Sequence, residues 1–299
     1  MIRAWWEIAV TSDAILEEII CWRLDTFGCS GTAVEMKNNF CLIKAYIPQI
    51  KVQALDLANL SDEFEQDSKL YGCDLPTLSY RLVDEEDWAN SWKQYWNPTP
   101  IGNNFIVYPA WLTPPENSKK NILRLDPGSA FGTGTHQTTQ LCLESLEILL
   151  KSSTKDLVIA DIGCGSGILS IGSLLLGAKK VYAVDTDILA VQATVSNCNL
   201  NQIDPSSLVV NQGSAENLIG LAGVEFDGIV CNILAEVIIK IMPEITQLGI
   251  NTTWLILSGL LESQADQVSQ CALDQGWVVK EKRVKSPWCS LSLYRNLVV

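Results

Sequence analysis

The sequence is poor in histidine, in paired cysteines and in long apolar runs. His136 is the only histidine, and none of the ten cysteines forms a CxxC pair, so a zinc site built from cysteine and histidine is excluded. No apolar run reaches the roughly 18 residues that a membrane-spanning helix needs. The first residues, MIRAWWEIAV, lack the apolar core of a secretory signal. These absences predict a cytoplasmic protein with reduced, structural cysteines, no bound metal and no membrane contact.

Positive charge is scarce as well. The chain has 21 Lys and Arg against 34 Asp and Glu, a formal net charge of −13. Residues 1–97 hold 16 acidic and 8 basic residues, a net charge of −8. Nucleic acids and anionic membranes are polyanions, so this charge disfavours both as direct partners. A basic protein is the partner that the charge permits, because long-range attraction would favour the encounter.

Residues 1–84 show an alternation of short strands and helices. Ser12 is a suitable N-cap for the first helix, and Lys37-Asn38-Asn39 has the composition of a turn between two strands. The order βαββαβ predicts a small ferredoxin-like α+β domain. Its predicted elements are strands at 5–10, 31–36, 40–47 and 77–83 and helices at 12–27 and 50–66.

Residues 85–119 are predicted to link this domain to the next one. Trp88, Trp92 and Trp96 recur every four residues, which places them on one face of a helix, where packing is a commoner role than ligand binding. The segment 97–100, with two prolines, ends that helix. We therefore expect a linker helix followed by a connecting segment.

From residue 120 onward the pattern changes to repeated strand–helix units. Short apolar, β-branched runs indicate strands that are buried on both faces of a parallel sheet. The last two strands are joined at Ser286-Pro287, and so tight a turn requires them to be antiparallel. Residues 120–299 are therefore predicted to form a doubly wound, Rossmann-like α/β domain with a seven-stranded sheet. Its predicted strands are 157–162, 181–185, 208–211, 228–232, 254–258, 277–284 and 288–295.

A glycine-rich turn follows the first of these strands. In DIGCGSG, at residues 161–167, Gly163, Gly165 and Gly167 stand between a strand and a helix. Glycines there permit positive φ and let a ligand approach the backbone closely. A dinucleotide fingerprint, GxGxxG, requires a glycine where this chain has Ile168. The observed GxGxG spacing resembles instead the S-adenosylmethionine-binding turn of class I methyltransferases.

The next two strands end in residues suited to a nucleoside. Asp185 lies 22 residues after Gly163, where a carboxylate can accept hydrogen bonds from both ribose hydroxyls. A helix cap is the alternative role, and Asp187 serves it better. Gly213 and Ser214 follow the third strand, and their backbone is a candidate contact for adenine, with a plain surface loop as the alternative.

The fourth strand leads into NILAEV, whose first residue is Asn232. Amino-methylating enzymes carry Asn/Asp-Pro-Pro-Tyr/Phe at this place, where the Asn carbonyl accepts a hydrogen bond from the substrate amine and aims its lone pair at the methyl group. This chain lacks the two prolines and the aromatic residue, which stacks on planar amines. The pattern therefore favours an aliphatic amine as substrate. A strand-end turn is the alternative role for Asn232.

The loop FGTGTHQTT, at residues 131–139, lacks the lysine of a phosphate-binding P-loop. We interpret it as a flap over a methyl-donor pocket, in which Phe131 is an apolar wall near the methyl group. Thr139, at the start of a helix, is expected to contact the cofactor. His136 is a candidate base, but a lone histidine in a Gly/Thr loop more often orders that loop, and we favour this role.

Together, LDPGSAFGTGTHQTT, DIGCGSG, VDTD, NILAEV and LSGLL resemble the PrmA family, the methyltransferases of large-subunit ribosomal protein eleven. The resemblance covers essentially the whole chain, because the N-terminal module and the tryptophan-rich linker are also similar to that family's recognition domain and linker. It implies an S-adenosylmethionine-dependent enzyme that methylates lysine side-chain amines, and the N-terminal amine, of a basic ribosomal protein. The cofactor contacts that it implies are Thr139, Gly163, Asp185 and Asn232.

Some features depart from that pattern or leave other functions open. Ser129 and Gln137 stand where relatives often carry other residues, which changes little in the interpretation. The alternatives are an N-methyltransferase for another protein or a small-molecule amine, a cofactor-binding module without catalysis, and a nicotinamide dehydrogenase, which Ile168 disfavours. We expect the protein to be a monomer.

Overall fold

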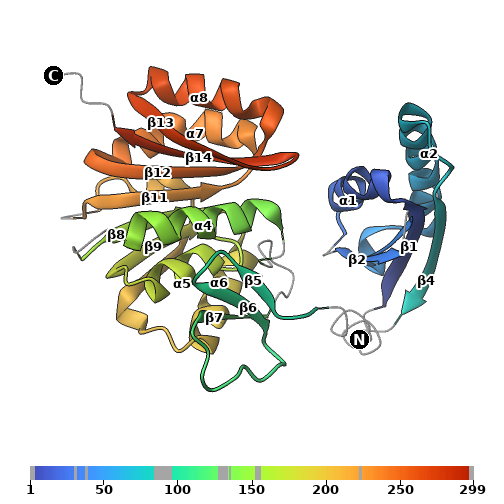
Figure 1. Ribbon diagram of the computed structural model, residues 1–299, viewed down its shortest axis with the longest axis horizontal. Coiled ribbons are helices and arrows are strands. Elements are labelled where there is room, and N and C mark those ends of the chain that lie inside the picture. Colours follow the sequence, from blue (N-terminus) through green and yellow to red (C-terminus); the bar gives the residue numbers. More distant parts are fainter. Residues whose placement is uncertain are drawn as a thin grey trace. The chain divides into compact units, whose positions relative to one another are not determined.

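The chain divides into two compact units, Met1–Asn97 and Pro98–Val299 (Figure 1). The structure, a computed structural model, describes residues 4–29, 32–37, 40–83, 96–126, 134, 136–151, 156–221 and 224–295. Within these ranges no helix is both long enough and apolar enough to cross a membrane. All ten cysteines are free thiols.

The first unit is a four-stranded antiparallel sheet with two helices packed on one face. Its core joins Ile8, Val10 and Ile43 of the sheet to Ile20 and Phe64 of the helices. The strand order β2-β3-β1-β4 confirms the predicted ferredoxin-like fold. The elements are β1 (Trp5–Asp13), α1 (Glu17–Thr26), β2 (Thr32–Lys37), β3 (Phe40–Pro48), α2 (Ala54–Tyr71) and β4 (Thr77–Val83).

The first helix begins later than the sequence pattern predicts. β1 stays paired with β3 as far as Asp13, which lies opposite Phe40. Ser12 is therefore a strand residue, and its hydroxyl donates to the backbone oxygen of Asp13 at 3.2 Å. A 3-10 turn follows at Ala14–Leu16, and α1 starts at Glu17. The prediction of Ser12 as an N-cap is wrong, because continued strand pairing outweighs the local capping preference.

The second unit is built on a seven-stranded sheet in the order β10-β9-β8-β11-β12-β14-β13. Neighbours from β10 to β12 are parallel, whereas β14 is antiparallel to both β12 and β13. This arrangement confirms the predicted doubly wound sheet with a terminal hairpin. The strands are β8 (Val158–Ile162), β9 (Lys180–Asp185), β10 (Leu208–Gln212), β11 (Phe226–Asn232), β12 (Gly249–Leu261), β13 (Trp277–Lys285) and β14 (Trp288–Arg295).

Helices cover both faces of this sheet (Figure 1). Side chains alternate between the faces of a strand. Ala160 and Ile162 of β8 pack in one core with the apolar stripes of α7 and α8. Asp161, between them, bonds to Ser170 of α5 on the opposite face. The helices are α4 (Gln137–Lys151), α5 (Ile168–Leu175), α6 (Ile188–Leu200), α7 (Ala235–Leu248) and α8 (Ala265–Asp274).

A small three-stranded sheet, which the sequence pattern did not predict, precedes the large one in the chain. β5 (Thr99–Ile101) pairs antiparallel with β6 (Phe105–Pro109), which pairs parallel with β7 (Asn121–Leu125). Residues that we expected to form only a connecting segment therefore include two strands of the second unit. Trp88 and Trp92 of the predicted linker helix lie outside the described residues. The assignment of separate roles to residues 1–84, 85–119 and 120–299 stays a prediction.

The β5–β6 turn is fixed by a carboxylate from α4. Glu147 is buried and accepts the backbone N–H groups of Asn103 and Asn104 at 3.0 and 2.7 Å. Gly102 in the same turn has φ +52°, and a Cβ there would lie 2.7 Å from the Glu147 carboxylate oxygens. This turn therefore requires glycine, and α4 holds the small sheet against the large one.

The strand order reverses its direction at the carboxyl edge of the large sheet. From β8 the chain moves outward through β9 and β10, and then crosses to β11 on the other side of β8. Such a reversal of direction is the place where open α/β sheets bind ligands. The glycine turn follows β8 and the NILA segment follows β11, so both lie at this reversal.

Candidate active site

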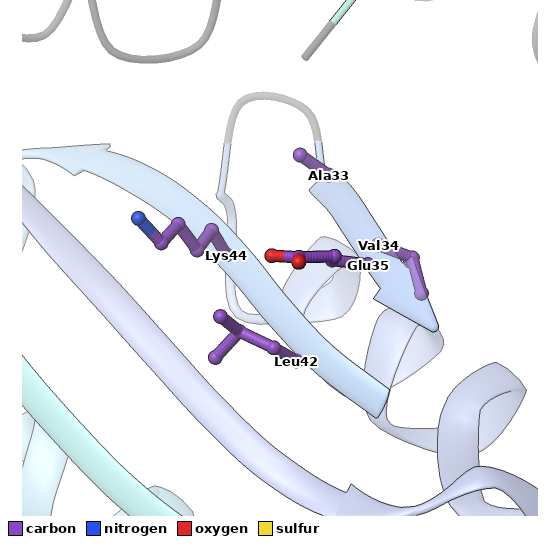
Figure 2. Close-up of a pocket in the computed structure, with 5 residues that line it drawn as sticks. All are labelled: Ala33, Val34, Glu35, Leu42 and Lys44. Atoms are coloured by element: carbon purple, nitrogen blue, oxygen red, sulfur yellow. The ribbon is translucent and has the colours of Figure 1, made fainter. Parts of the chain in front are cut away.

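A hollow in the first unit is too small to be the site. It lies between β2 and β3, where Glu35, Leu42 and Lys44 project from neighbouring strands (Figure 2). Its cavity volume is about 10 Å³, which is the room that about one water molecule needs. The reversal of strand order at the carboxyl edge of the large sheet points to the site instead.

The glycine turn after β8 has a backbone that only glycine adopts easily. Gly163, Gly165 and Gly167 have φ values of +74°, +54° and +79°, in the left-handed region that favours glycine. A Cβ on Gly163 would collide with the side chain of Ile233, and one on Gly167 would lie 2.8 Å from Thr194. The turn is thus closely packed from both sides, as a backbone cradle for a ligand requires.

Asp185, at the end of β9, tethers the glycine turn. One carboxylate oxygen accepts the backbone N–H of Gly165 at 2.9 Å, and the other accepts that of Asp187 at 2.9 Å. Asp187 caps α6 by accepting the N–H of Leu189, so the helix-cap role falls to Asp187. Each oxygen of Asp185 keeps a second lone pair, which leaves capacity for ribose hydroxyls. Ribose binding by Asp185 stays a prediction.

The turn after β10 is hydrogen-bonded to the backbone of Asp185. The N–H of Gly213 donates to the backbone oxygen of Asp185 at 2.8 Å, and the N–H of Ser214 donates to the side chain of Asn217 at 2.8 Å. These bonds bring the predicted adenine-contacting residues next to the predicted ribose-binding residue. The adenine contact itself stays a prediction.

Asn232, the last residue of β11, carries a buried hydrogen-bond acceptor that no donor in the described part of the chain reaches. Its register partner on β12 is Ser258, and its side chain is 9% exposed. The carbonyl oxygen Oδ1 has no hydrogen-bond partner among the residues that the structure describes. An unsatisfied buried acceptor costs about 1–3 kcal/mol, so its persistence suits a site that a ligand completes.

Ile233, the residue after Asn232, is held between two glycines. Its side chain covers Gly163, and its backbone lies so close to Gly259 that a Cβ on Gly259 would collide with the Ile233 carbonyl. Gly259 has φ +82° and belongs to the LSGLL stretch. The motifs DIGCGSG, NILAEV and LSGLL therefore meet at this one residue.

The first turn of α4 completes this edge. The hydroxyl of Ser258 donates to the backbone oxygen of Thr138 at 3.4 Å. Thr139 is fully buried, and its hydroxyl has no partner within the described part of the chain. Two of the predicted site residues, Thr139 and Asn232, thus keep unpartnered polar atoms. Phe131, the predicted apolar wall, and Ser129 lie outside the described residues.

His136 serves as the N-cap of α4. Its ring Nδ1 accepts the backbone N–H of Thr138 at 3.3 Å and lies 2.7 Å from the Thr138 hydroxyl. Its backbone oxygen accepts the N–H of Gln140, and its ring packs edge-on to Trp288 at 4.9 Å between centroids. Burial lowers the pKa of His136, which favours the neutral ring. The arrangement suits the loop-ordering role and does not suit a base.

Asp161 is a further candidate site residue, which the sequence reasoning missed. It lies in β8, two residues before Gly163, and is 1% exposed. Its Oδ2 accepts the hydroxyl of Ser170 at 2.6 Å, whereas Oδ1 has no partner among the described residues. Burial raises the pKa of Asp161 to about 6, and the charge of Asp185 contributes in the same direction. A carboxylate inside the apolar run VIADI was the available sequence signal.

The raised pKa of Asp161 makes stability depend on pH. The folded state, with a pKa of about 6 against 3.8 for the ordinary carboxyl, binds the proton more tightly than the unfolded state. The unfolding free energy should therefore fall as pH rises through this window, by about 2 kcal/mol between pH 4.5 and 7.5. Urea unfolding of the wild type and of Asp161→Asn across this range measures it. Parallel pH curves for the two proteins would contradict the assignment.

The fold and the site together define a class of protein. A seven-stranded sheet with one antiparallel strand, a glycine turn after the first strand and an acidic residue after the second characterise the class I, S-adenosylmethionine-dependent methyltransferases. The residues present fit that cofactor. The turn offers a backbone cradle, and Thr139, Asp161 and Asn232 hold buried polar atoms that a ligand can satisfy.

Comparison with known proteins narrows this class to one family. The family model described as ribosomal protein L11 methyltransferase (PrmA) matches residues 4–296, and the chain belongs to this family. The membership confirms the resemblance seen in the sequence motifs. It also shows that the dehydrogenase alternative is wrong.

Individual relatives agree. The chain is 49% identical to a ribosomal protein L11 methyltransferase of Thermosynechococcus vestitus, over 98% of this chain and 97% of that one. It is 47% identical to the protein of that description from a Cyanothece species, over 99% and 100% of the two chains. The crystal structure of a ribosomal protein L11 methylase from Lactobacillus delbrueckii subsp. bulgaricus matches with a TM-score of 0.60 at 31% identity, covering 67% of this chain and 100% of that chain.

Proposed function

We propose that this chain transfers methyl groups from S-adenosylmethionine to lysine side-chain amines and to the N-terminal amine of ribosomal protein L11. The relatives described above are named as methyltransferases of ribosomal protein L11. The observation that supports an amine substrate best is the unpartnered Oδ1 of Asn232 beside the glycine turn. It is an acceptor, and an amine is a donor.

Several residues would hold the cofactor. The backbone of Gly163 and Gly165 would receive its methionine part, and Asp185 would accept hydrogen bonds from its ribose. The free Oδ1 of Asp161 suits an ammonium group, because a buried carboxylate is stabilised by an opposite charge. Thr139 would contribute a hydroxyl. When bound, S-adenosylmethionine supplies an electrophilic methyl group on a positively charged sulfur.

The turn after β10 is the proposed adenine contact. Gly213 and Ser214 lie at the end of a strand paired with β9, and the backbone bond from Gly213 to Asp185 keeps the turn beside the ribose-binding carboxylate. Phe131, on the preceding flap, would add the apolar wall near the methyl group.

The substrate amine must be neutral before it can attack. A free lysine has a pKa of about 10.4, so deprotonation at pH 7 costs about 4.6 kcal/mol, whereas an α-amine costs only about 1 to 1.4 kcal/mol. His136 suits a base poorly, because its Nδ1 is already used as an acceptor within the helix cap. A desolvated position against Asn232 lowers the cost of the neutral amine.

Orientation of the substrate amine then supplies most of the rate enhancement. The Oδ1 of Asn232 accepts an N–H of the neutral amine and so directs the nitrogen lone pair at the methyl group. Holding two reactants in line in this way is worth on the order of 7 to 11 kcal/mol. The absence of an aromatic side chain in NILA leaves room for a flexible aliphatic amine.

Substrate recognition is the proposed role of the first unit. Its residues carry a net charge of −8 (16 acidic and 8 basic residues), which attracts a basic ribosomal protein at long range. The enzyme would act as a monomer in the cytoplasm, where that substrate is made, without direct contact to nucleic acid or membrane.

Isolated components test the function. Purified protein, isotopically labelled S-adenosylmethionine and purified L11 are expected to give methylated L11, with added masses in multiples of one methyl group on lysines and the N-terminus by peptide mass mapping. A basic protein of similar size is the control. Cofactor binding without methyl transfer would favour the non-catalytic module, and transfer to another protein or a small amine instead of L11 would overturn the substrate assignment.

A further inference from the structure

A stripe of polar residues on α6 contacts two separate parts of the proposed cofactor site. Thr194, Asn197 and Asn201 lie three and four residues apart, so they share one face of the helix and its C-terminal end. Thr194 and Asn197 are almost completely buried. Asparagine is a poor helix former, and a buried amide is unfavourable unless it is bonded. The hydrogen bonds that these side chains make therefore explain why polar residues occupy this buried face of the helix.

Asn197 bonds to the glycine turn and to the end of β7 at the same time. Its Nδ2 donates to the backbone oxygen of Ser166 at 2.9 Å. Its Oδ1 accepts the backbone N–H of Asp126, the first residue after β7, at 2.9 Å. From Asp126 the chain continues toward His136 and α4. One amide thus joins the turn after β8 to the strand end that leads to the other wall of the site.

Thr194 also donates a hydrogen bond to the glycine turn. Its hydroxyl donates to the backbone oxygen of Gly165 at 3.0 Å, next to the carbonyl that Asn197 holds. A peptide unit is planar and trans, so fixing the direction of its carbonyl fixes the direction of its N–H. The two side chains therefore set the orientation of two successive peptide planes in the glycine turn.

Asn201 provides a natural comparison, because it bonds to β7 but not to the glycine turn. Its Oδ1 accepts the N–H of Arg124 at 2.8 Å, and its Nδ2 donates to the Arg124 oxygen at 2.6 Å and to the Asn197 oxygen at 2.7 Å. Asn201 thus pairs with the backbone of β7, and Asn197 with the residue directly after it. Of the two, only Asn197 also bonds to the glycine turn.

We infer that Asn197 is a positioning residue of the methyl-donor site, with Thr194 as its companion. Asn197 holds the glycine turn in its ligand-binding conformation and keeps it in register with the end of β7. The inference rests on the proposed function only in taking the glycine turn as the cofactor cradle. Neither side chain needs to touch the cofactor for this role.

Two variants remove the bonds to the turn. Asn197→Asp keeps an acceptor for the Asp126 N–H but cannot donate to Ser166, and Thr194→Val keeps the shape while losing the hydroxyl. Each is expected to raise the dissociation constant for S-adenosylhomocysteine, measured by calorimetry, by about ten-fold, the equivalent of one hydrogen bond to the cradle. KM for S-adenosylmethionine should rise accordingly, with kcat at saturation changing by less.

Asn201→Ala is the matched control. It is expected to lower the melting temperature, because it breaks two bonds to β7, while the dissociation constant stays within about two-fold of the wild type. An Asn197→Asp or Thr194→Val protein that is folded and binds S-adenosylhomocysteine as tightly as the wild type overturns the inference. So does an equal loss of affinity in Asn201→Ala. A wild-type protein that binds no S-adenosylhomocysteine overturns the proposed function instead.

Discussion

Asn232→Ala is expected to lower kcat for amine methylation by about 10²-fold or more, because misorientation of a reacting group by a small distance costs that much. The affinity for S-adenosylmethionine should fall far less, since the glycine turn, Asp185 and the turn after β10 remain. Single-turnover rates with L11 at saturating cofactor measure the chemical step, and calorimetry with S-adenosylhomocysteine measures binding.

Asn232→Asp is the control for this prediction. The variant keeps an oxygen acceptor at the same place in β11, so it should retain more activity than the alanine variant at a pH where the carboxyl is ionised. An alanine variant that binds cofactor normally and methylates at the wild-type rate would show that Asn232 only terminates the strand. The unpartnered Oδ1 would then need another explanation.

Removal of the first unit, residues 1–97, should separate cofactor binding from protein methylation. Each unit has its own buried core, so the second unit, Pro98–Val299, is expected to fold and to bind S-adenosylhomocysteine about as well as the full chain. Methylation of L11 should fall by at least about 10²-fold in kcat/KM, the loss that about 2.7 kcal/mol of docking energy produces. Undiminished methylation by the truncated protein would refute the recognition role.

The isolated first unit supplies a second measurement. If residues 1–97 recognise the substrate, this fragment should bind L11 and inhibit the full enzyme competitively. The affinity should weaken as salt concentration rises, because the attraction between an acidic unit and a basic protein is screened. A fragment that folds, as judged by circular dichroism, but does not inhibit would also count against the role.

The large sheet was predictable because its strands are buried on both faces. Such strands read as short apolar runs, and the glycine, aspartate and asparagine that end them mark the carboxyl edge. The small sheet escaped prediction because β5 has only three residues, one of which is Pro100, and its turn depends on Glu147, more than forty residues away. The prediction of Ser12 as a helix N-cap was wrong because a local capping preference is weaker than nine residues of strand pairing.

The candidate site, like the fold, could be predicted from the sequence only in part. Asp185 and Asn232 were identifiable as candidates from their places at strand ends, and the structure brings the strand ends that carry them to one edge of the sheet. Asp161 becomes a candidate site residue only once its burial and its unpartnered oxygen are known. Asn197 was not identifiable, because its partners lie 31 and 71 residues away in the sequence. Long-range hydrogen bonds leave no periodic pattern.

The contact of Ile233 with Gly163 on one side and Gly259 on the other has a mechanical consequence. Ile233 would act as a rigid spacer between the turn that we propose to receive the methyl donor and the asparagine that we propose to orient the amine. In that arrangement the separation of the two reactants would be set by the Ile233 side chain that packs against Gly163, and not by the position of a flexible loop. Substitutions at Gly163 and Ile233 would then be tolerated only in combinations that preserve that separation.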